Sequence, residues 1–302
     1  MASDELEFVE WLRGQRRDHP AVKLGIGDDM AIVEALPGRI LVSSDMILDG
    51  VHFDTGCQSL SQIGRKAIAC SLSDCAAMAV RPVAATVSVA LPTANPLTDA
   101  QELFRGMFAI ADEYELAIAG GDTTRWDHPL AIDVAITAIP YDGIEPVTRS
   151  GAKPGDTLYV TGYLGGSLLG RHLGFTPRVR EARTLADRLG ERLHAMIDIS
   201  DGLALDLWRM CRASNVGATL VERQLEPVIS DDAKRAAIAD GNTPLDHALG
   251  DGEDFELLLA VDGDVADTGL TLHPVGQVTG GDLLLRRTGG GIEPLEPKGY
   301  VP

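Results

Sequence analysis

Several carboxylates of this sequence stand in glycine- and serine-rich turns that directly follow apolar stretches. Four such junctions occur, and their sequences are GIGDD, ILVSSD, LAIAGGDTT and AMIDISDG. Ligands of α/β proteins usually bind at the ends of strands. Mg²⁺ commonly binds one or two carboxylates together with phosphate oxygens. The pattern therefore suggests chemistry on a phosphate that is held through a divalent cation.

Helix capping and turn formation are the alternative explanation for each junction taken alone. Asp and Ser are common turn formers and N-caps. For Ser200 and Asp201, which precede a helix expected from Leu203, capping is favoured by roughly two to one. Asp29 stays open between a ligand and a turn cap. Four junctions in one chain shift the balance toward a shared site, but their number alone is only suggestive.

Asp74 stands on the apolar line of an expected helix. Helical spacing in SQIGRKAIACSLSDCAAM places it on one face with Ile63, Ala67 and Cys70. A buried carboxylate without a partner is very costly, so the position requires a cation. Either an arginine, such as Arg65 or Arg81, or a metal ion would supply it.

The composition is that of a globular protein with an acidic surface. The 302 residues are 45% hydrophobic, and 26 Lys and Arg against 45 Asp and Glu give a net charge of −19. Such a surface repels nucleic acids and anionic membranes, so anionic substrates would need a mediating cation. No apolar run approaches the ~20 residues of a membrane span, and the N-terminus lacks the apolar core of a signal peptide. We expect a cytoplasmic protein that binds neither membrane nor nucleic acid.

Other catalytic motifs are absent from the sequence. It contains no GxxxxGK[ST], no GxSxG and no HExxH. The four cysteines form no CxxC pair, which argues against a zinc site or a disulfide framework. His52, in DGVHFD, is either a surface turn residue or a group within reach of a substrate phosphate.

Strands and helices alternate along the chain, which predicts an α/β or α+β fold with two domains. The stretch 140–156, PYDGIEPVTRSGAKPGD, is dense in Pro and Gly and is the best candidate boundary. We therefore expect domains at 1–141 and 142–302. The expected helices cover residues 4–15, 59–80, 98–114, 165–173, 184–193 and 203–213. The expected strands begin or lie at 39–42, 82–91, 116–119, 131–139, 158–161, 194–199 and 254–261.

Together the motifs resemble those of the thiamine-monophosphate kinase family. The segments occur in that family's order and at about its separations, from about residue 4 to 261. They are GIGDDMAIV, SSDMILDGVHF, GRKAIACSLSDCAAMAVRP, GGDTTR, RSGAKPGD, ISDGLALDL and GEDFELLL. The related aminoimidazole ribonucleotide synthetases, selenophosphate synthetases and hydrogenase-maturation enzymes share the fold and part of the acid set. They do not share the combination of DGVHF, SLSDCAAM, GGDTTR and GEDFEL.

The resemblance implies a fold and a reaction. N-terminal domains of two copies would form a shared β-barrel in a homodimer, with a C-terminal α/β domain packed against it and ATP between the domains. The γ-phosphoryl group of ATP would pass directly, in line, to thiamine phosphate with several Mg²⁺ ions. The implied metal ligands are Asp28, Ser43, Ser44, Asp45, Asp74, Asp122, Asp198 and Asp201. The implied ATP contacts are Gly121, Asp122, Arg149 and Ser200, and the thiamine phosphate contacts are His52, Glu253 and Tyr300. Asp45, Asp122 and Arg149 would be catalytic.

Some positions depart from the family pattern. Ser43-Ser44 replaces a more usual Thr-Thr, Phe255 stands where Tyr is common, and the ending KGYVP lacks an expected His-Phe. Two alternatives are another ATP-using enzyme of the superfamily and a non-catalytic metal-binding scaffold. Arg149 and the intact acid set argue against the scaffold, because a scaffold needs no cation that faces ATP.

Overall fold

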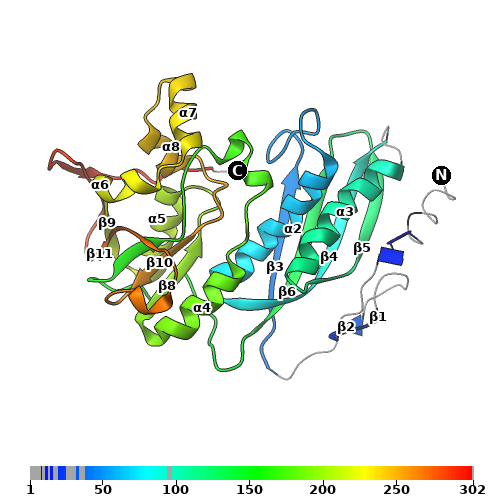
Figure 1. Cartoon of the computed structure of the whole chain (residues 1–302), viewed down its shortest axis with the longest axis horizontal. Helices are drawn as coiled ribbons and strands as arrows, with labels where there is room; N and C mark the ends of the chain where they lie inside the picture. The colour runs from blue at the N-terminus through cyan, green and yellow to red at the C-terminus, as the bar shows by residue number, and fades with distance from the viewer. Residues whose placement is uncertain are drawn as a thin grey trace. The chain divides into compact units, whose positions relative to one another are not determined.

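The computed structural model describes residues 8, 11–12, 14–15, 20–24, 32–33, 38–93 and 97–300. The chain forms two compact units, which are residues 1–75 with 81–140 and residues 76–80 with 141–302. Figure 1 shows the elements of both. Asp28 and Asp29 lie outside the described residues.

The N-terminal unit is built on a four-stranded sheet in the order β3-β6-β4-β5. β3 pairs antiparallel with β6, whereas β4 pairs parallel with β5. The strands are β3 (Leu41–Leu48), β4 (Val80–Pro92), β5 (Ala117–Trp126) and β6 (Ala131–Pro140). A separate antiparallel pair is formed by β1 (Val22–Leu24) and β2 (Ile32–Val33).

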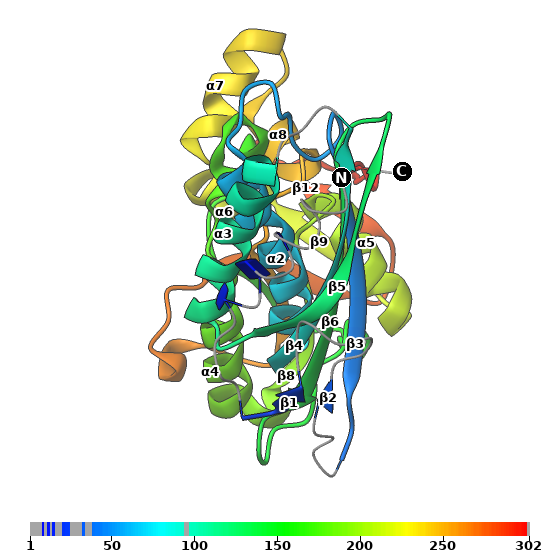
Figure 2. The same ribbon diagram turned by 90° about the vertical axis from the view of Figure 1, so that its right-hand side faces the viewer.

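Helices α2 (Leu60–Ala77) and α3 (Leu97–Glu113) cover one face of this sheet (Figure 2). They approach closely at two glycines. A Cβ on Gly64 would lie 2.0 Å from the carbonyl oxygen of Leu103, and one on Gly106 would lie 1.9 Å from that of Ser61. Neither position has room for a side chain, so these glycines set the helix–helix distance. The other face of the sheet is open at its β3 edge, where Val42 is 76% exposed and Met46 60%.

The C-terminal unit contains a seven-stranded sheet in the order β13-β12-β9-β11-β7-β10-β8. All its pairs are antiparallel except β12 with β9. The strands are β7 (Thr157–Val160), β8 (Leu193–Asp198), β9 (Gly217–Val221), β10 (Leu257–Val261), β11 (His273–Thr279), β12 (Leu283–Arg286) and β13 (Ile292–Pro294). The α-helices are α4 (Val179–Leu189), α5 (Leu203–Ser214), α6 (Glu222–Leu225), α7 (Asp231–Asp240) and α8 (Pro244–Gly250).

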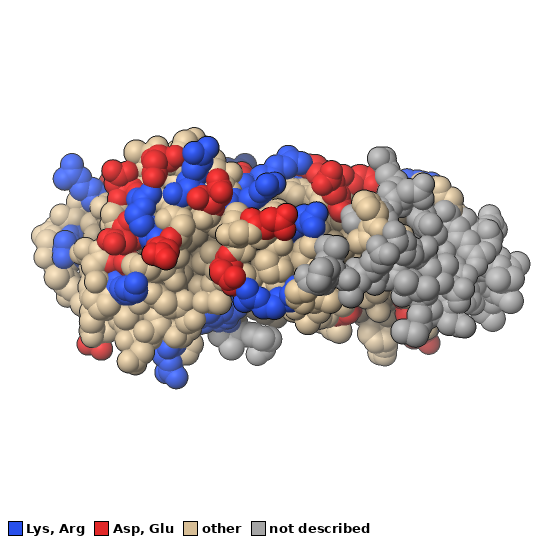
Figure 3. All heavy atoms as spheres, turned by 90° about the horizontal axis from the view of Figure 1, so that it is seen from below, with Lys and Arg blue, Asp and Glu red and all other residues tan. Residues whose placement is uncertain are grey.

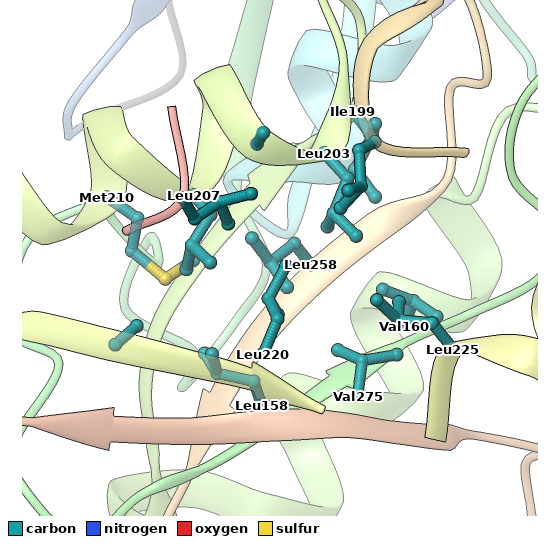
Figure 4. Packing of buried hydrophobic residues seen from close by; sticks show 14 of the residues in the cluster. Leu158, Val160, Ile199, Leu203, Leu207, Met210, Leu220, Leu225, Leu258 and Val275 are labelled. Carbon is teal, nitrogen blue, oxygen red and sulfur yellow. The ribbon is translucent and has the colours of Figure 1, made fainter. Parts of the chain in front are cut away.

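The core of this unit lies between the sheet and α5 (Figure 4). Leu203, Leu207 and Met210 of the helix are fully buried, as their i, i+4, i+7 spacing predicts. They pack in one cluster with Leu220 of β9 and Leu258 of β10. This packing fixes the first turn of α5 against the end of β8, where three of the predicted site residues lie.

Several expected elements are confirmed, and five are wrong in extent or type. α2, α5, β4, β6 and β8 lie where the sequence predicts them. The helix expected at 184–193 covers Val179–Leu189 instead (α4). β3 and β5 are longer than expected, so SSD and GGDTT lie within strands rather than after them. The expected helix at 165–173 is two 3₁₀ turns, Ser167–Leu169 and Arg171–Leu173. The strand expected from Asp254 begins at Leu257, because Phe255 has a φ of +51°, which extended backbone does not allow.

Charges of both signs lie on the face drawn in Figure 3, despite the excess of acids in the sequence. Among the described residues, no helix combines the length and the apolar character that a membrane span needs.

Candidate phosphate and metal site

Asp45 and Asp74 form a close pair of carboxylates in the N-terminal unit. Asp45 lies in the middle of β3, on the face covered by α2, and its Oδ2 accepts a hydrogen bond from Ser71 Oγ at 2.8 Å. Burial first, and then the negative charge of Asp74, raise the pKa of Asp45 to about 7. Two carboxylates this close destabilise each other when both are ionised. Helical periodicity predicts that Asp74 needs a cation, and the structure places a second carboxylate, that of Asp45, beside it.

The hydroxyl of Ser43 supplies a further oxygen on the same face of β3. Residues i and i+2 of a strand point to the same side, so Ser43 lies beside Asp45. Its Oγ is buried and has no hydrogen-bond partner among the described residues. A buried hydroxyl without a partner costs about 1–3 kcal/mol. Two crowded carboxylates and an unsatisfied hydroxyl form an oxygen-only set, which fits a Mg²⁺ ion.

Ser44 is not part of this cluster. It points to the opposite face of β3, where its hydroxyl donates to Asp133 Oδ1 at 2.9 Å. The extra length of β3 decides this, because a turn after Val42 would have allowed Ser43 and Ser44 to point the same way.

Asp122 is placed apart from Asp45. It lies within β5, opposite Ser88 of β4, and it is exposed. β5 and β3 are the two edges of the sheet, so three strand spacings, about 14 Å, separate them. Gly121 precedes it, and a Cβ there would lie 1.9 Å from the carbonyl oxygen of Val87. The glycine is therefore required by the close approach of β5 to β4.

His52 lies in a tight turn that follows β3. Its Nδ1 accepts a hydrogen bond from the backbone N–H of Leu48 at 3.1 Å. The ring proton consequently sits on Nε2, which makes that nitrogen a donor. The carbonyl of His52 accepts a hydrogen bond from Nζ of Lys66, whose side chain is fully buried in α2. Lys66 thus ties the turn to the helix.

In the C-terminal unit, Asp198 is the last residue of β8, and Ser200 and Asp201 follow in the turn before α5. The prediction that Ser200 or Asp201 caps α5 is wrong. Gly202 occupies the N-cap position, and no side chain caps it. Instead Asp206 Oδ2 accepts hydrogen bonds from the backbone N–H groups of Ser200, Asp201 and Gly202, at 3.0–3.1 Å.

Asp206 is a buried carboxylate that the sequence analysis missed. Its burial raises its pKa to about 6, while Arg209 pairs with both Asp206 and Asp201. The signal that identified Asp74 was available here too, because Asp206 lies between the buried Leu203 and Leu207 in the first turns of an apolar helix. A carboxylate on such a line requires partners, and here they are three N–H groups and a guanidinium.

The segment GEDFE, residues 252–256, lies against the turn of Ser200 and Asp201. The N–H of Glu253 donates to the carbonyl of Ser200 at 2.7 Å. Glu253 and Phe255 have φ values of +57° and +51°. Left-handed backbone costs a non-glycine residue roughly 1–2 kcal/mol and is typical of functional sites. The Phe255 ring is stacked on Phe175 with centroids 4.1 Å apart, which offsets part of that cost.

Two buried ion pairs brace the same segment. Asp254 accepts hydrogen bonds from the N–H of Gly165, at 2.9 and 3.0 Å, and from Arg171 at 2.8 Å. Glu256 forms a bidentate pair with Arg178, at 2.7 and 2.8 Å. These acids hold the backbone of the loop rather than a ligand. Their arginines come from segments more than 70 residues away in sequence, so spacing gave no signal of the pairing.

Tyr300 is brought to the same turn, since its N–H donates to the carbonyl of Asp201 at 2.9 Å. Its side chain is 44% exposed.

Arg149 lies near the start of residues 141–302, and its side chain is exposed. The C-terminal unit therefore gathers four predicted residues: Ser200, Asp201, Glu253 and Tyr300. Within the described part of the chain, no three His, Cys, Asp or Glu side chains form a group that could hold a metal.

Comparison with known proteins identifies the two halves of the chain. Residues 27–140 match the family model of the AIR synthase related protein, N-terminal domain. Residues 153–283 match that of the AIR synthase related protein, C-terminal domain.

Individual relatives are more specific. The chain is 43% identical to a thiamine-monophosphate kinase from Rhodopirellula baltica, covering 98% of this chain and 96% of the relative. It is similar to the crystal structure of a thiamine-monophosphate kinase from Stenotrophomonas maltophilia K279a, with a TM-score of 0.78, 30% identity and coverage of 93% and 95%. The structure of AaThiL complexed with AMPPCP and TMP matches with a TM-score of 0.76, 27% identity and 91% coverage of each chain.

Proposed function

We propose that this chain, which belongs to the thiamine-monophosphate kinase family, transfers the γ-phosphoryl group of ATP to thiamine phosphate. The observation that carries the proposal is the pairing of Asp45 with Asp74 beside the buried hydroxyl of Ser43. That oxygen-only site stands in a chain with an excess of acids, where two anionic substrates could not meet without a cation. ATP is a cytoplasmic metabolite, so we place the reaction in the cytoplasm.

The proposed metal ligands are Asp45, Asp74 and Ser43, with Asp28, Ser44, Asp122, Asp198 and Asp201 as further candidates for additional ions. When bound, Mg²⁺ would neutralise phosphate charge and align donor with acceptor. The acceptor is already an ionised phosphate, so the reaction requires no strong general base. We therefore assign none, and direct in-line transfer needs no phosphorylated side chain.

Other residues would bind the two substrates. We assign ATP to Gly121, Asp122, Arg149 and Ser200, where the guanidinium of Arg149 would stabilise charge on the transferred group. The Nε2–H of His52 would donate to thiamine phosphate, because the turn fixes its other nitrogen as an acceptor. Glu253 and Tyr300 would contact the thiamine moiety, and both lie on the turn of Ser200 and Asp201.

We also propose a homodimer that forms through the open face of the N-terminal sheet. Val42 and Met46, which are 76% and 60% exposed, share this face of β3, and Ile40, which directly precedes the strand, is 53% exposed. An exposed apolar row on an edge strand is a typical protein–protein contact. Two such sheets would close into the barrel that the sequence resemblance implies.

The decisive test is a direct assay. Purified protein with ATP, Mg²⁺ and thiamine phosphate should form thiamine diphosphate, which thiochrome fluorescence detects. Asp45→Asn should abolish the product, whereas Asp231→Asn, which removes an exposed carboxylate of α7, should not. Turnover of aminoimidazole precursors or selenide in place of thiamine phosphate would instead identify another enzyme of the superfamily. Failure to bind ATP would indicate a scaffold.

A further inference from the structure

The loop 151–156 and the start of β8 carry a cluster of three ionisable side chains that the proposed reaction does not use. Nζ of Lys153 lies 2.9 Å from Nε2 of His194, and Nδ1 of His194 lies 2.9 Å from both carboxylate oxygens of Asp156. The Asp156 side chain is 4% exposed and that of His194 12%, while Lys153 is exposed. His194 and Asp198 stand at opposite ends of β8, roughly 13 Å apart, so this cluster is distinct from the turn of Ser200.

The hydrogen bonds assign the proton positions. Asp156 accepts the Nδ1 proton of His194, so Nε2 is the acceptor for Lys153. An amine, a histidine base and a carboxylate that orients the base form the arrangement that activates nucleophiles in enzymes. Here the group at the nucleophile position is the Lys153 amine.

The surrounding backbone holds the cluster rigid. Asp156 Oδ2 also accepts the N–H of Lys153 at 2.7 Å, so one carboxylate positions both partners. The N–H groups of Gly151 and Ala152 donate to Ser214 Oγ, each at 3.1 Å. A Cβ at Gly151, whose φ is +117°, would lie 2.5 Å from the carbonyl oxygen of His194. Only glycine permits this approach of the loop to β8.

We propose that Lys153 is a modification site, acylated by acyl phosphates at a rate enhanced by His194 and Asp156. The free-amine form of Lys153 attacks the acyl carbon. As the C–N bond forms, His194 Nε2 takes the proton that the nitrogen loses, and Asp156 stabilises the resulting imidazolium. The C–O bond to phosphate breaks, and phosphate leaves with the bonding electron pair and takes up that proton from His194. The product is an uncharged amide at Lys153.

The other lysines of the same chain provide internal references. The chain contains five lysines, of which Lys234 and Lys298 are exposed like Lys153. Lys234 pairs with Asp231 at 2.9 Å. The full-length protein would be incubated with acetyl phosphate at pH 8, and acetylation of each lysine followed by peptide mass spectrometry. Lys153 should react about tenfold faster than Lys234 or Lys298, which is less than the roughly 10²–10⁴-fold that a positioned base contributes in an enzyme active site, because Lys153 is exposed.

His194→Gln is the decisive variant, because glutamine can accept the hydrogen bond but cannot take the proton. It should reduce the rate at Lys153 about tenfold and leave that at Lys234 unchanged. Asp156→Asn should act in the same direction, with an unchanged thermal unfolding curve as evidence that the loop is intact. Equal rates at Lys153 and Lys234, or an unchanged Lys153 rate in folded His194→Gln, would overturn the proposal. The readout is acetylation at Lys153, so the outcome does not depend on kinase activity.

Discussion

Replacing Asp74 by asparagine should stabilise the metal-free protein at high pH while it removes activity. The pKa of Asp45 is raised from 3.8 to about 7. At ~1.36 kcal/mol per pKa unit this means that ionised Asp45 costs about 4 kcal/mol in the folded state. Burial is the largest cause and the charge of Asp74 the second. Asp74→Asn should therefore recover the smaller part, about 1–2 kcal/mol.

The stability gain from Asp74→Asn should depend on pH in a defined direction. Because the folded pKa of Asp45 lies above the unfolded one, the folded protein binds more protons between pH 4 and 7, and stability falls as pH rises through that range. The gain from Asp74→Asn should be present at pH 8 and absent at pH 5, where Asp45 is protonated in both proteins. At pH 8 without metal, the melting temperature should rise by about 2–4 °C per kcal/mol.

Thermal unfolding in EDTA at pH 5 and pH 8 measures the effect. For the experiment in EDTA, Asp122→Asn is the matched control, because it removes an exposed carboxylate on the other edge of the same sheet. Added Mg²⁺ should stabilise the wild-type protein at pH 8 more than Asp74→Asn, and the variant should lose orders of magnitude in kcat. A variant that is destabilised by the same amount at both pH values would refute the carboxylate pairing.

Three further substitutions test residues that hold the backbone of the proposed site in place or contact the substrate. Lys66→Met removes the bond to the His52 carbonyl, so the KM for thiamine phosphate should rise about tenfold while that for ATP changes less than twofold in steady-state kinetics. Asp206→Ala leaves three backbone N–H groups without an acceptor and should cost about 1–3 kcal/mol in urea unfolding; an unchanged midpoint would contradict its role. Glu253→Gly relieves left-handed backbone strain and should stabilise the protein by up to about 1 kcal/mol, yet weaken binding of thiamine phosphate. Equal or tighter binding in calorimetry would remove Glu253 from the site.

Single residues show how far sequence reasoning reached into the site. Asp74 was identified by helical periodicity alone, because a carboxylate on an apolar line demands a partner wherever the helix packs. The same reasoning applied to Asp206 would have found the acid that shapes the turn of Ser200. In contrast, the pairing of Arg171 and Arg178 with their acids could not be predicted, because those acids lie 83 and 78 residues away along the chain.

The boundaries of strands were the main source of error. β3 continues through Ser43, Ser44 and Asp45 because α2 covers this part of the sheet. A polar turn at this position would need surrounding solvent, and α2 occupies that space. β10 begins three residues later than its apolar sequence suggests, because Glu253 and Phe255 adopt left-handed backbone that hydrogen bonds to Ser200 and Ile199 support. Local propensity cannot predict either outcome, because both depend on distant contacts.

Residue types and their spacing are enough to predict the chemistry of the site and most of the elements that carry it. Oxygen donors, an acidic surface and the motif order predict phosphate handled through a divalent cation. Which of these donors meet depends on packing between distant segments. The tertiary structure joined Asp45 to Asp74, turned Ser43 toward them and Ser44 away, and brought Tyr300 to Asp201. Those choices follow from packing of α2 on β3 and of the chain's C-terminal segment on α5, contacts between segments far apart in sequence.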